Sequence, residues 1–468
     1  MIIEYTIGAL AVLLAASGLS TLLHRNARIA LASNVVFLAL IGATFAYAFA
    51  TGYYASSAIQ VSQFSSLFGV LFSITLIFAS VLSYAYSNRF SALSALLSVV
   101  AVGVMIVDTS NSLISLILGM EAIAVPTVFL IALESGSAEP AVKFFVMSAM
   151  AVAAFALGIA ALMAYDPGLS IAFSSISAPV SGLMLLGALL AVAALSFEAS
   201  LFPFNLWIPD VYQGAKSNIT ALLAGINKKV AFVALAYVSF VLFAAYIPKL
   251  APAFLALSVL TMFFGNIMAL VQKNVKRMFA YSSISQAGYI LIGFATATQY
   301  GIGASIYQII AHSFTIIGSF AIILWLEQQG KQSVDDYSAL SKRAPLAAAT
   351  LTVFMLSLAG LPPLAGFYGK FLLFSGAVSG GLLSLALVGI LNSFISIYYY
   401  GRLMLSIYSN GRPKLIGMPT PITFVMLACL VVVVAIGLYP QPVIAAANSA
   451  SSYLFGAFNT PASSPAPG

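Results

Sequence analysis

Six ionisable side chains lie inside long apolar stretches of the sequence. They are Glu121, Glu198, Lys228, Lys229, His312 and Lys370. An ionised group near the middle of a bilayer costs from about 2.5 to more than 10 kcal/mol, so such residues usually serve a function. Burial brings the pKa values of Glu and Lys toward neutrality, which lets neighbours exchange protons, whereas arginine stays protonated. Because none of the six is arginine, the set favours a proton relay.

Two structural interpretations stay open for these side chains. The glutamates and lysines could form buried ion pairs that only stabilise a helix bundle. His312 could be a hydrogen-bonded core histidine, although an imidazole can also titrate near neutral pH and join a relay. A structural role and a proton relay differ in what is lost on substitution, because a structural residue is needed for assembly and a relay residue for proton movement.

The composition places these residues in a membrane protein. The chain has 468 residues, of which 62% are hydrophobic and 6% are charged, where a soluble protein carries about 25% charged residues. The net charge of +7 comes from basic residues scattered between apolar stretches, so nucleic-acid binding is not expected. Cys429 is the only cysteine, and we expect no metal, haem or iron–sulfur cofactor in this chain.

Fourteen apolar stretches of about 18 to 28 residues are long enough to cross the bilayer as α-helices. They cover residues 3–23, 29–50, 64–86, 91–108, 111–133, 140–164, 181–206, 218–246, 251–272, 278–297, 302–326, 345–374, 381–406 and 420–446. Basic residues follow the odd-numbered stretches, with Lys249 as the exception, so both termini should face outward from the plasma membrane. The tail from Thr460 to Gly468 should be disordered.

Two of the predicted helices carry prolines in their interior. Pro203 lies in the seventh stretch, and Pro362 and Pro363 lie in the twelfth. Proline breaks a helix, and a membrane tolerates the break only where protein or water satisfies the freed carbonyls. Paired breaks five helices apart predict two inverted five-helix repeats with the ion path at the breaks, although two unrelated kinked helices remain the alternative.

These features predict four regions in an all-α integral membrane protein. Helices one to three occupy residues 1–90, and the first antiporter-like half, helices four to eight, occupies residues 91–246. The inverted half, helices nine to thirteen, occupies residues 251–406. Helix fourteen and a short disordered tail occupy residues 407–468.

The sequence around the buried charges resembles the antiporter-like membrane subunits of respiratory complex I, and most closely the N-type subunit of NADH–quinone oxidoreductase. The resemblance covers about residues 90–410. Its motifs are LGMEAIAVPTVFLIA, PFNLWIPDVYQGA, ITALLAGINKKVAF, GNIMALVQKNVKRMFAYSSISQAGY and LAGLPPLAGFYGKF. The YQGA and GKF elements favour the N type over its sister subunits.

The resemblance implies a non-redox translocase subunit that moves protons while partner subunits reduce quinone. Quinone, iron–sulfur and flavin centres would then belong to partners, and M-type, L-type and small K-type subunits would be the neighbours. The family's glutamate corresponds to Glu121 and its lysines to Lys228 and Lys370. Glu198 departs from the family, which usually has lysine there, and we predict Lys229 as the compensating cation. A subunit of a multisubunit cation/proton antiporter is the alternative function.

Other charged residues are predicted to be structural. Lys276 and Arg277 belong to a basic cluster expected to anchor the chain near lipid headgroups. Asp210 is expected to cap the eighth helix or to pair with Lys216, and Asp108 is expected to lie in a loop.

Overall fold

The computed structural model describes residues 2–24, 26–52, 55–56, 59–165, 181–410 and 417–456 of the chain. Within these residues the fold is a helix bundle with one short hairpin of β1 (Ala55–Ser56) and β2 (Gln60–Val61). Ten helices of this described part are long and apolar enough to cross a membrane, and three shorter apolar helices accompany them. The prediction of an all-helical membrane protein is therefore confirmed.

The first six helices match the predicted spans closely. They are α1 (Ile2–His24), α2 (Ala27–Thr51), α3 (Gln63–Tyr86), α4 (Phe90–Asp108), α5 (Leu113–Glu134) and α6 (Glu139–Tyr165). Local signals set several of their starts, because Asn26 caps α2 and capping boxes at Ser62 and Ser112 begin α3 and α5. The prediction for Asp108 is wrong, since this residue ends α4 and does not lie in a loop.

The seventh and eighth predicted helices are both irregular. The seventh, predicted over 181–206, is helical only in α7 (Gly182–Glu198), and the short α8 (Trp207–Gly214) follows the break that contains Pro203. The eighth runs through α9 (Ser217–Leu222), the π-helical η1 (Leu223–Asn227), α10 (Lys228–Ala236), the π-helical η2 (Tyr237–Leu242) and η3 (Ala244–Tyr246). Turns of π-helix occur frequently at functional sites, and here Lys228 directly follows the first of them.

The second part of the chain contains the other predicted break. Its elements are α11 (Ile247–Leu270), α12 (Val275–Thr296), α13 (Gln299–Glu327), η4 (Val334–Tyr337), α14 (Leu340–Arg343), α15 (Pro345–Ala359), α16 (Ala365–Ser379) and α17 (Leu383–Tyr408). Gly360 closes α15 with a φ of 89°, a conformation that suits glycine and few other residues. Pro362 and Pro363 follow it, so both breaks expected from the prolines are present.

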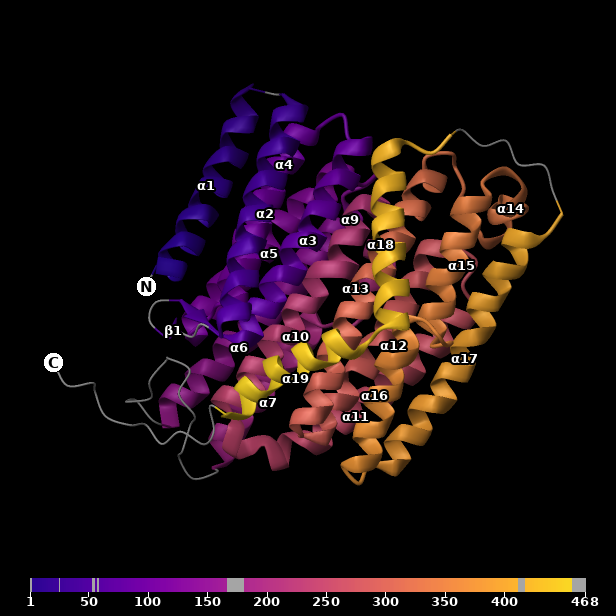
Figure 1. Cartoon of the computed structure of the whole chain (residues 1–468). Helices are drawn as coiled ribbons and strands as arrows, with labels where there is room; N and C mark the ends of the chain where they lie inside the picture. The colour runs from indigo at the N-terminus through magenta and orange to yellow at the C-terminus, as the bar shows by residue number, and fades with distance from the viewer. Residues whose placement is uncertain are drawn as a thin grey trace.

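The predicted last helix, 420–446, is wrong in its second part. The helix α18 (Thr420–Leu438) ends before Pro440, and α19 (Gln441–Gly456) then crosses the flank of the bundle in a different direction (Figure 1). It packs against α13, α3 and η2. Proline cannot continue the hydrogen bonding of α18, which explains the break. The predicted disordered tail lies outside the described residues.

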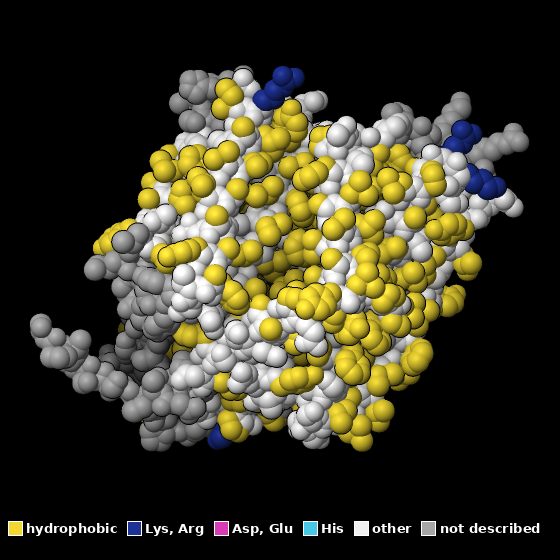
Figure 2. All heavy atoms as spheres, in the orientation of Figure 1, with side chains coloured by type: hydrophobic (Ala, Val, Ile, Leu, Met, Phe, Trp, Pro, Cys, Tyr) yellow, Lys and Arg dark blue, Asp and Glu magenta, His cyan; other side chains and the backbone are white. Residues whose placement is uncertain are grey.

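Two helical runs form the buried centre of the bundle. The run from Ser217 to Leu242 and the helix α13 are enclosed by protein along their apolar spans. The outer helices present hydrophobic side chains over the middle of the visible face, and Lys and Arg side chains appear at its edges (Figure 2). The fold therefore keeps the central helices away from lipid, and these helices carry Lys228, Lys229 and His312.

Candidate functional site

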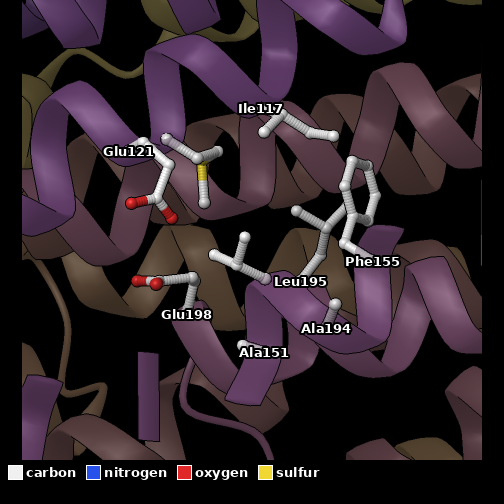
Figure 3. Close-up of a pocket in the computed structure, with 9 residues that line it drawn as sticks. Ile117, Glu121, Ala151, Phe155, Ala194, Leu195 and Glu198 are labelled. Atoms are coloured by element: carbon white, nitrogen blue, oxygen red, sulfur yellow. The ribbon is translucent and has the colours of Figure 1, made fainter. Parts of the chain in front are cut away.

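Glu121 and Glu198 line the same small pocket between α5, α6 and α7. Their carboxyl groups point toward the same side of it (Figure 3), and the cavity volume of about 20 Å³ leaves room for about one water molecule. Ser148 of α6 donates a hydrogen bond of 3.3 Å to Glu198. In the described residues no lysine or arginine forms an ion pair with either carboxyl. Two neighbouring acids repel each other when both are ionised, so the pair is suited to holding one proton.

Lys228 is held in place by α12. Its Nζ atom donates to the carbonyl oxygen of Ser283 at 2.5 Å and to the hydroxyl oxygen of the same residue at 3.1 Å. The adjacent Asn227 donates to Thr127 of α5 at 3.0 Å. The π-helical turn thus places Lys228 in contact with α12. The adjacent Asn227 contacts α5, the helix that carries Glu121.

Lys229 and His312 form a second buried group of bases. Both side chains are buried, and neither the Nζ atom nor either imidazole nitrogen has a hydrogen-bond partner in the described part of the chain. His312 interacts electrostatically with both Lys229 and Lys228. These three groups are coupled, because a proton on any one of them repels a proton on the others.

The geometry does not support Lys229 as the compensating cation for Glu198. The charged neighbour of Glu198 is Glu121, whereas Lys229 interacts with Lys228 and His312. Consecutive residues on a helix point about 100° apart. Since the Lys228 side chain contacts α12, the Lys229 side chain is turned away from α12. Lys229 interacts electrostatically with His312 of α13.

Lys370 lies just beyond the break between α15 and α16. Its Nζ atom donates to the carbonyl oxygen of Ala359 at 3.0 Å, one of the carbonyls left free where α15 ends. The same atom lies 4.4 Å from the centroid of the Tyr289 ring, a cation–π distance. The break therefore supplies a carbonyl ligand for a buried ammonium group.

A row of amide side chains lies between the two lysine sites. Gln286 follows Ser283 by one turn of α12, donates to the carbonyl oxygen of Leu358 at 3.0 Å and accepts from Gln308 of α13 at 2.9 Å. The other polar atom of the Gln308 amide, its Oε1, receives no hydrogen bond from the residues that the structure describes. Gly369 packs closely against this Oε1 atom, since a Cβ atom added to Gly369 would lie only 1.9 Å from it. The row therefore reaches the residue next to Lys370.

His312 belongs to the same row by its position on α13. It follows Gln308 by four residues, and side chains at that spacing lie on one face of a helix. The structure therefore places Lys228, Lys229, His312 and Lys370 along one buried polar row. The hydrogen bond from Asn227 to Thr127 connects the run that carries Lys228 to α5, the helix that carries Glu121.

Sequence reasoning missed a buried ion pair at the end of the bundle. Lys276 of α12 contacts Glu327 of α13 at 2.5 Å, and their side chains are 4% and 15% exposed. Lys276 also donates to the carbonyl oxygen of Ala215, while Glu327 accepts from the backbone and hydroxyl of Ser217 at 2.9 and 2.6 Å. The prediction that Lys276 anchors the chain near lipid headgroups is wrong. The pair instead caps the start of α9, the run that carries Lys228.

Asp210 and its neighbours form a second network at this end of the bundle. Asp210 accepts from Lys143 of α6 and from Arg277 of α12, both at 2.7 Å. Lys216 pairs with Glu134 at 3.0 Å, so the expected pair between Asp210 and Lys216 is wrong. These partners are far apart in the sequence, and no local spacing signals them.

Removing only one partner of the buried pair should destabilise the bundle. Glu327→Leu leaves Lys276 buried without its partner, and we expect a loss of about 3 kcal/mol because an uncompensated buried charge is costly. The double variant Lys276→Met/Glu327→Leu should regain much of this loss. The melting temperature of the solubilised protein, with Lys331→Met as a control, measures both effects. A single variant as stable as the unaltered chain would contradict the cost assigned to the unpaired charge.

Comparison with known proteins decides the family. The family described as NADH:quinone oxidoreductase/Mrp antiporter, transmembrane, matches residues 110–396, which is more than half of the chain. The chain belongs to this family. It is a multi-pass antiporter-like membrane subunit of complex I-type enzymes, of the N type, as its motifs predicted.

Relatives of the N type match most of the chain. F(420)H(2) dehydrogenase subunit N of Methanosarcina mazei is 34% identical over 429 residues, which cover 85% of each chain. NADH-quinone oxidoreductase subunit N of Desulfitobacterium hafniense is 33% identical over 459 residues, which cover 90% of this chain and 92% of the relative.

Two solved structures share the fold of this antiporter-like subunit. A chain of respiratory complex I from Thermus thermophilus aligns with a TM-score of 0.81 and 28% identity, over 94% of this chain and 99% of that chain. A chain of the Mrp complex from Dietzia aligns with a TM-score of 0.86 and 19% identity, over 96% and 97%. At this low identity, the similarity to the Mrp complex chain concerns the fold alone.

Proposed function

We propose that this N-type subunit carries protons across the plasma membrane while partner subunits of a complex I-type oxidoreductase reduce quinone. The electron donor, which is F(420)H(2) or NADH in the names of the two relatives described above, would bind to a partner. Membrane subunits of the M, L and small K types are the proposed neighbours. Both termini would face the outer side, opposite the basic loops.

The observation that carries this proposal is the buried row from Lys228 to Lys370. A proton held between Glu121 and Glu198 would pass to the Lys228 amine, breaking an O–H bond and forming an N–H bond. It would continue past His312 and the two glutamines to Lys370. Lysine and histidine can accept and release the proton along this row, and water molecules would bridge the remaining gaps.

The two helix breaks support an arrangement of fourteen spans with two inverted halves. The first half, residues 91–246, contains the break between α7 and α8. The second, residues 251–406, contains the break between α15 and α16. Each break lies near a proposed proton carrier, because Glu198 ends α7 and Lys370 lies in α16. Broken helices at matching places in two halves are typical of inverted-repeat transporters.

Glu198→Gln should lower the rate of proton pumping by about threefold, well below the roughly 10²-fold effect of losing an irreplaceable proton-transfer group, because Glu121 remains in the same pocket. Glutamine keeps the shape of the side chain and its contact with Ser148 but cannot carry a proton. Acidification of proteoliposomes during quinone reduction measures the effect. Glu139→Gln is the matched control, because Glu139 is an exposed carboxyl at the start of α6. Unchanged pumping and assembly in Glu198→Gln would contradict the role given to the carboxyl pair.

The alternative function, a subunit of a cation/proton antiporter, has one specific observation in its favour, the likeness of fold to the Mrp complex. Mass spectrometry of the gently solubilised complex separates the two functions. Co-purification of iron–sulfur and donor-binding subunits is the expected result. A complex that lacks these subunits and exchanges cations for protons without an electron donor would support the antiporter instead.

A further inference from the structure

One buried carboxyl lies outside the row described above. Asp108 ends α4, is fully buried, and has no hydrogen-bond partner for either carboxyl oxygen in the described part of the chain. It lies at the end of α4 that is remote from the basic residue Arg89, which begins the helix. The chain soon returns toward the surface, because Asn111 is only half-buried.

Polar groups from three other elements surround this end of α4. The hydroxyl of Tyr237 in η2 donates to the backbone carbonyl oxygen of Asp108 at 2.7 Å. The Tyr237 side chain also forms hydrogen bonds with Ser62 and Ser65 at the start of α3. It interacts electrostatically with the Asp108 carboxyl. The backbone of Gln60 donates to the carbonyl oxygen of Thr109 at 3.0 Å. The backbone carbonyls at this end of α4 thus have donors, whereas the Asp108 carboxyl receives no hydrogen bond in the described part of the chain.

Among the residues that the structure describes, no lysine, arginine or histidine forms an ion pair with Asp108. The titratable group that interacts with the Asp108 carboxyl is Tyr237, which also interacts electrostatically with Tyr453 of α19. The helices packed against α4 carry further charged or titratable residues, which are Glu4, Tyr5, His24, Arg28, Tyr47, Tyr84, Tyr86, Glu121, Glu134, Lys228 and Lys229. The two lysines precede Tyr237 by about two turns of the same helical run.

An ionised carboxylate at this position would be unfavourable for two independent reasons. It would be buried without a hydrogen-bond donor, and it would lie at the negative end of the α4 helix dipole. The side chain is therefore stable when it carries a proton. It can lose that proton only when water reaches it, and the chain becomes partly exposed again at Asn111, three residues further on.

We propose that Asp108 is a proton-binding site at the outer end of the first half, serving the proton transport proposed above. In the releasing step the O–H bond of its carboxyl breaks and the proton passes to water at the outer face. The carboxylate then regains a proton that leaves the ammonium group of Lys229 through intervening water, restoring the acid and a neutral amine. The Tyr237 hydroxyl holds the end of α4 in place during this exchange.

The test is Asp108→Asn in the intact complex, reconstituted into liposomes. Asparagine has almost the size of aspartate but carries no exchangeable acid proton. Protons pumped per electron should fall at least twofold, while quinone reduction in the presence of a protonophore should continue. Asp108→Glu should keep more than half of the pumping ratio. Ser110→Ala, at a buried residue of the same helix end, should leave the ratio unchanged.

Each other outcome overturns the proposal. If Asp108→Asn pumps with the unaltered ratio, the side chain is a neutral packing residue. If Asp108→Asn and Asp108→Leu both fail to assemble, Asp108 is required for folding and not for the pumping step. The result can be distinguished from a failure of the Lys228 to Lys370 relay, because Lys228→Met tests that row separately and leaves Asp108 intact.

Discussion

Lys228→Met is expected to reduce proton transfer through this subunit by roughly two orders of magnitude, the size of effect seen when a proton-transfer group is removed. Methionine fills a similar volume but cannot bind a proton, and it loses both bonds to Ser283. Protons pumped per electron in proteoliposomes provide the measurement. The content of this subunit in the purified complex shows whether assembly is intact.

Lys249→Met is the matched control for this substitution. Lys249 is exposed at the end of the bundle opposite the other loop lysines, and the same change there should leave pumping intact. A purely structural role for Lys228 gives the opposite pattern, in which the complex fails to assemble but the assembled fraction pumps normally. That pattern would refute the relay.

Lys370→Met should have an effect of similar size, and Lys370→Arg should separate charge from proton transfer. Arginine keeps the positive charge beside the Tyr289 ring and can donate to the Ala359 carbonyl, but it does not release its proton at any physiological pH. If the lysine acts as a proton carrier, both variants lose about 10²-fold in transfer rate. Initial rates of proteoliposome acidification compare them.

The Lys370→Arg variant distinguishes a proton carrier from a buried charge that only stabilises the structure. A residue that only stabilises the break between α15 and α16 should tolerate arginine, and pumping should then remain within about twofold of the unaltered complex. Recovery of pumping in Lys370→Arg, with Lys370→Met inactive, would show that a fixed charge is sufficient at this position.

The sequence predicted the helices well because each one carries its own signal. Apolar length identifies a span, and Pro203, Pro362 and Pro363 mark the two breaks. The last span was wrong although Pro440 was visible, because the apolar residues continue across it. Hydrophobicity does not reveal a change in helix direction when both helices pack against the same protein surface.

The partners of the charged residues could not be predicted in the same way. The contact between Lys276 and Glu327, and the contacts of Asp210, join positions separated by more than 50 residues. Helical geometry gives the angle between Lys228 and Lys229 but not which neighbouring helix each one faces. That choice depends on how α12 and α13 pack, and for the same reason the burial of Asp108 appears only in the folded chain.

The enclosure of the central helices has a consequence for how the chain enters the membrane. The run from Ser217 to Leu242 carries two lysines, and each costs about 2.5 to 3.5 kcal/mol at the centre of a helix that partitions into lipid alone. Ser283, which binds one of them, is synthesised more than fifty residues later. We therefore expect this run to enter lipid poorly before α12 and α13 emerge, and biogenesis of the subunit should stall in chains truncated before α12.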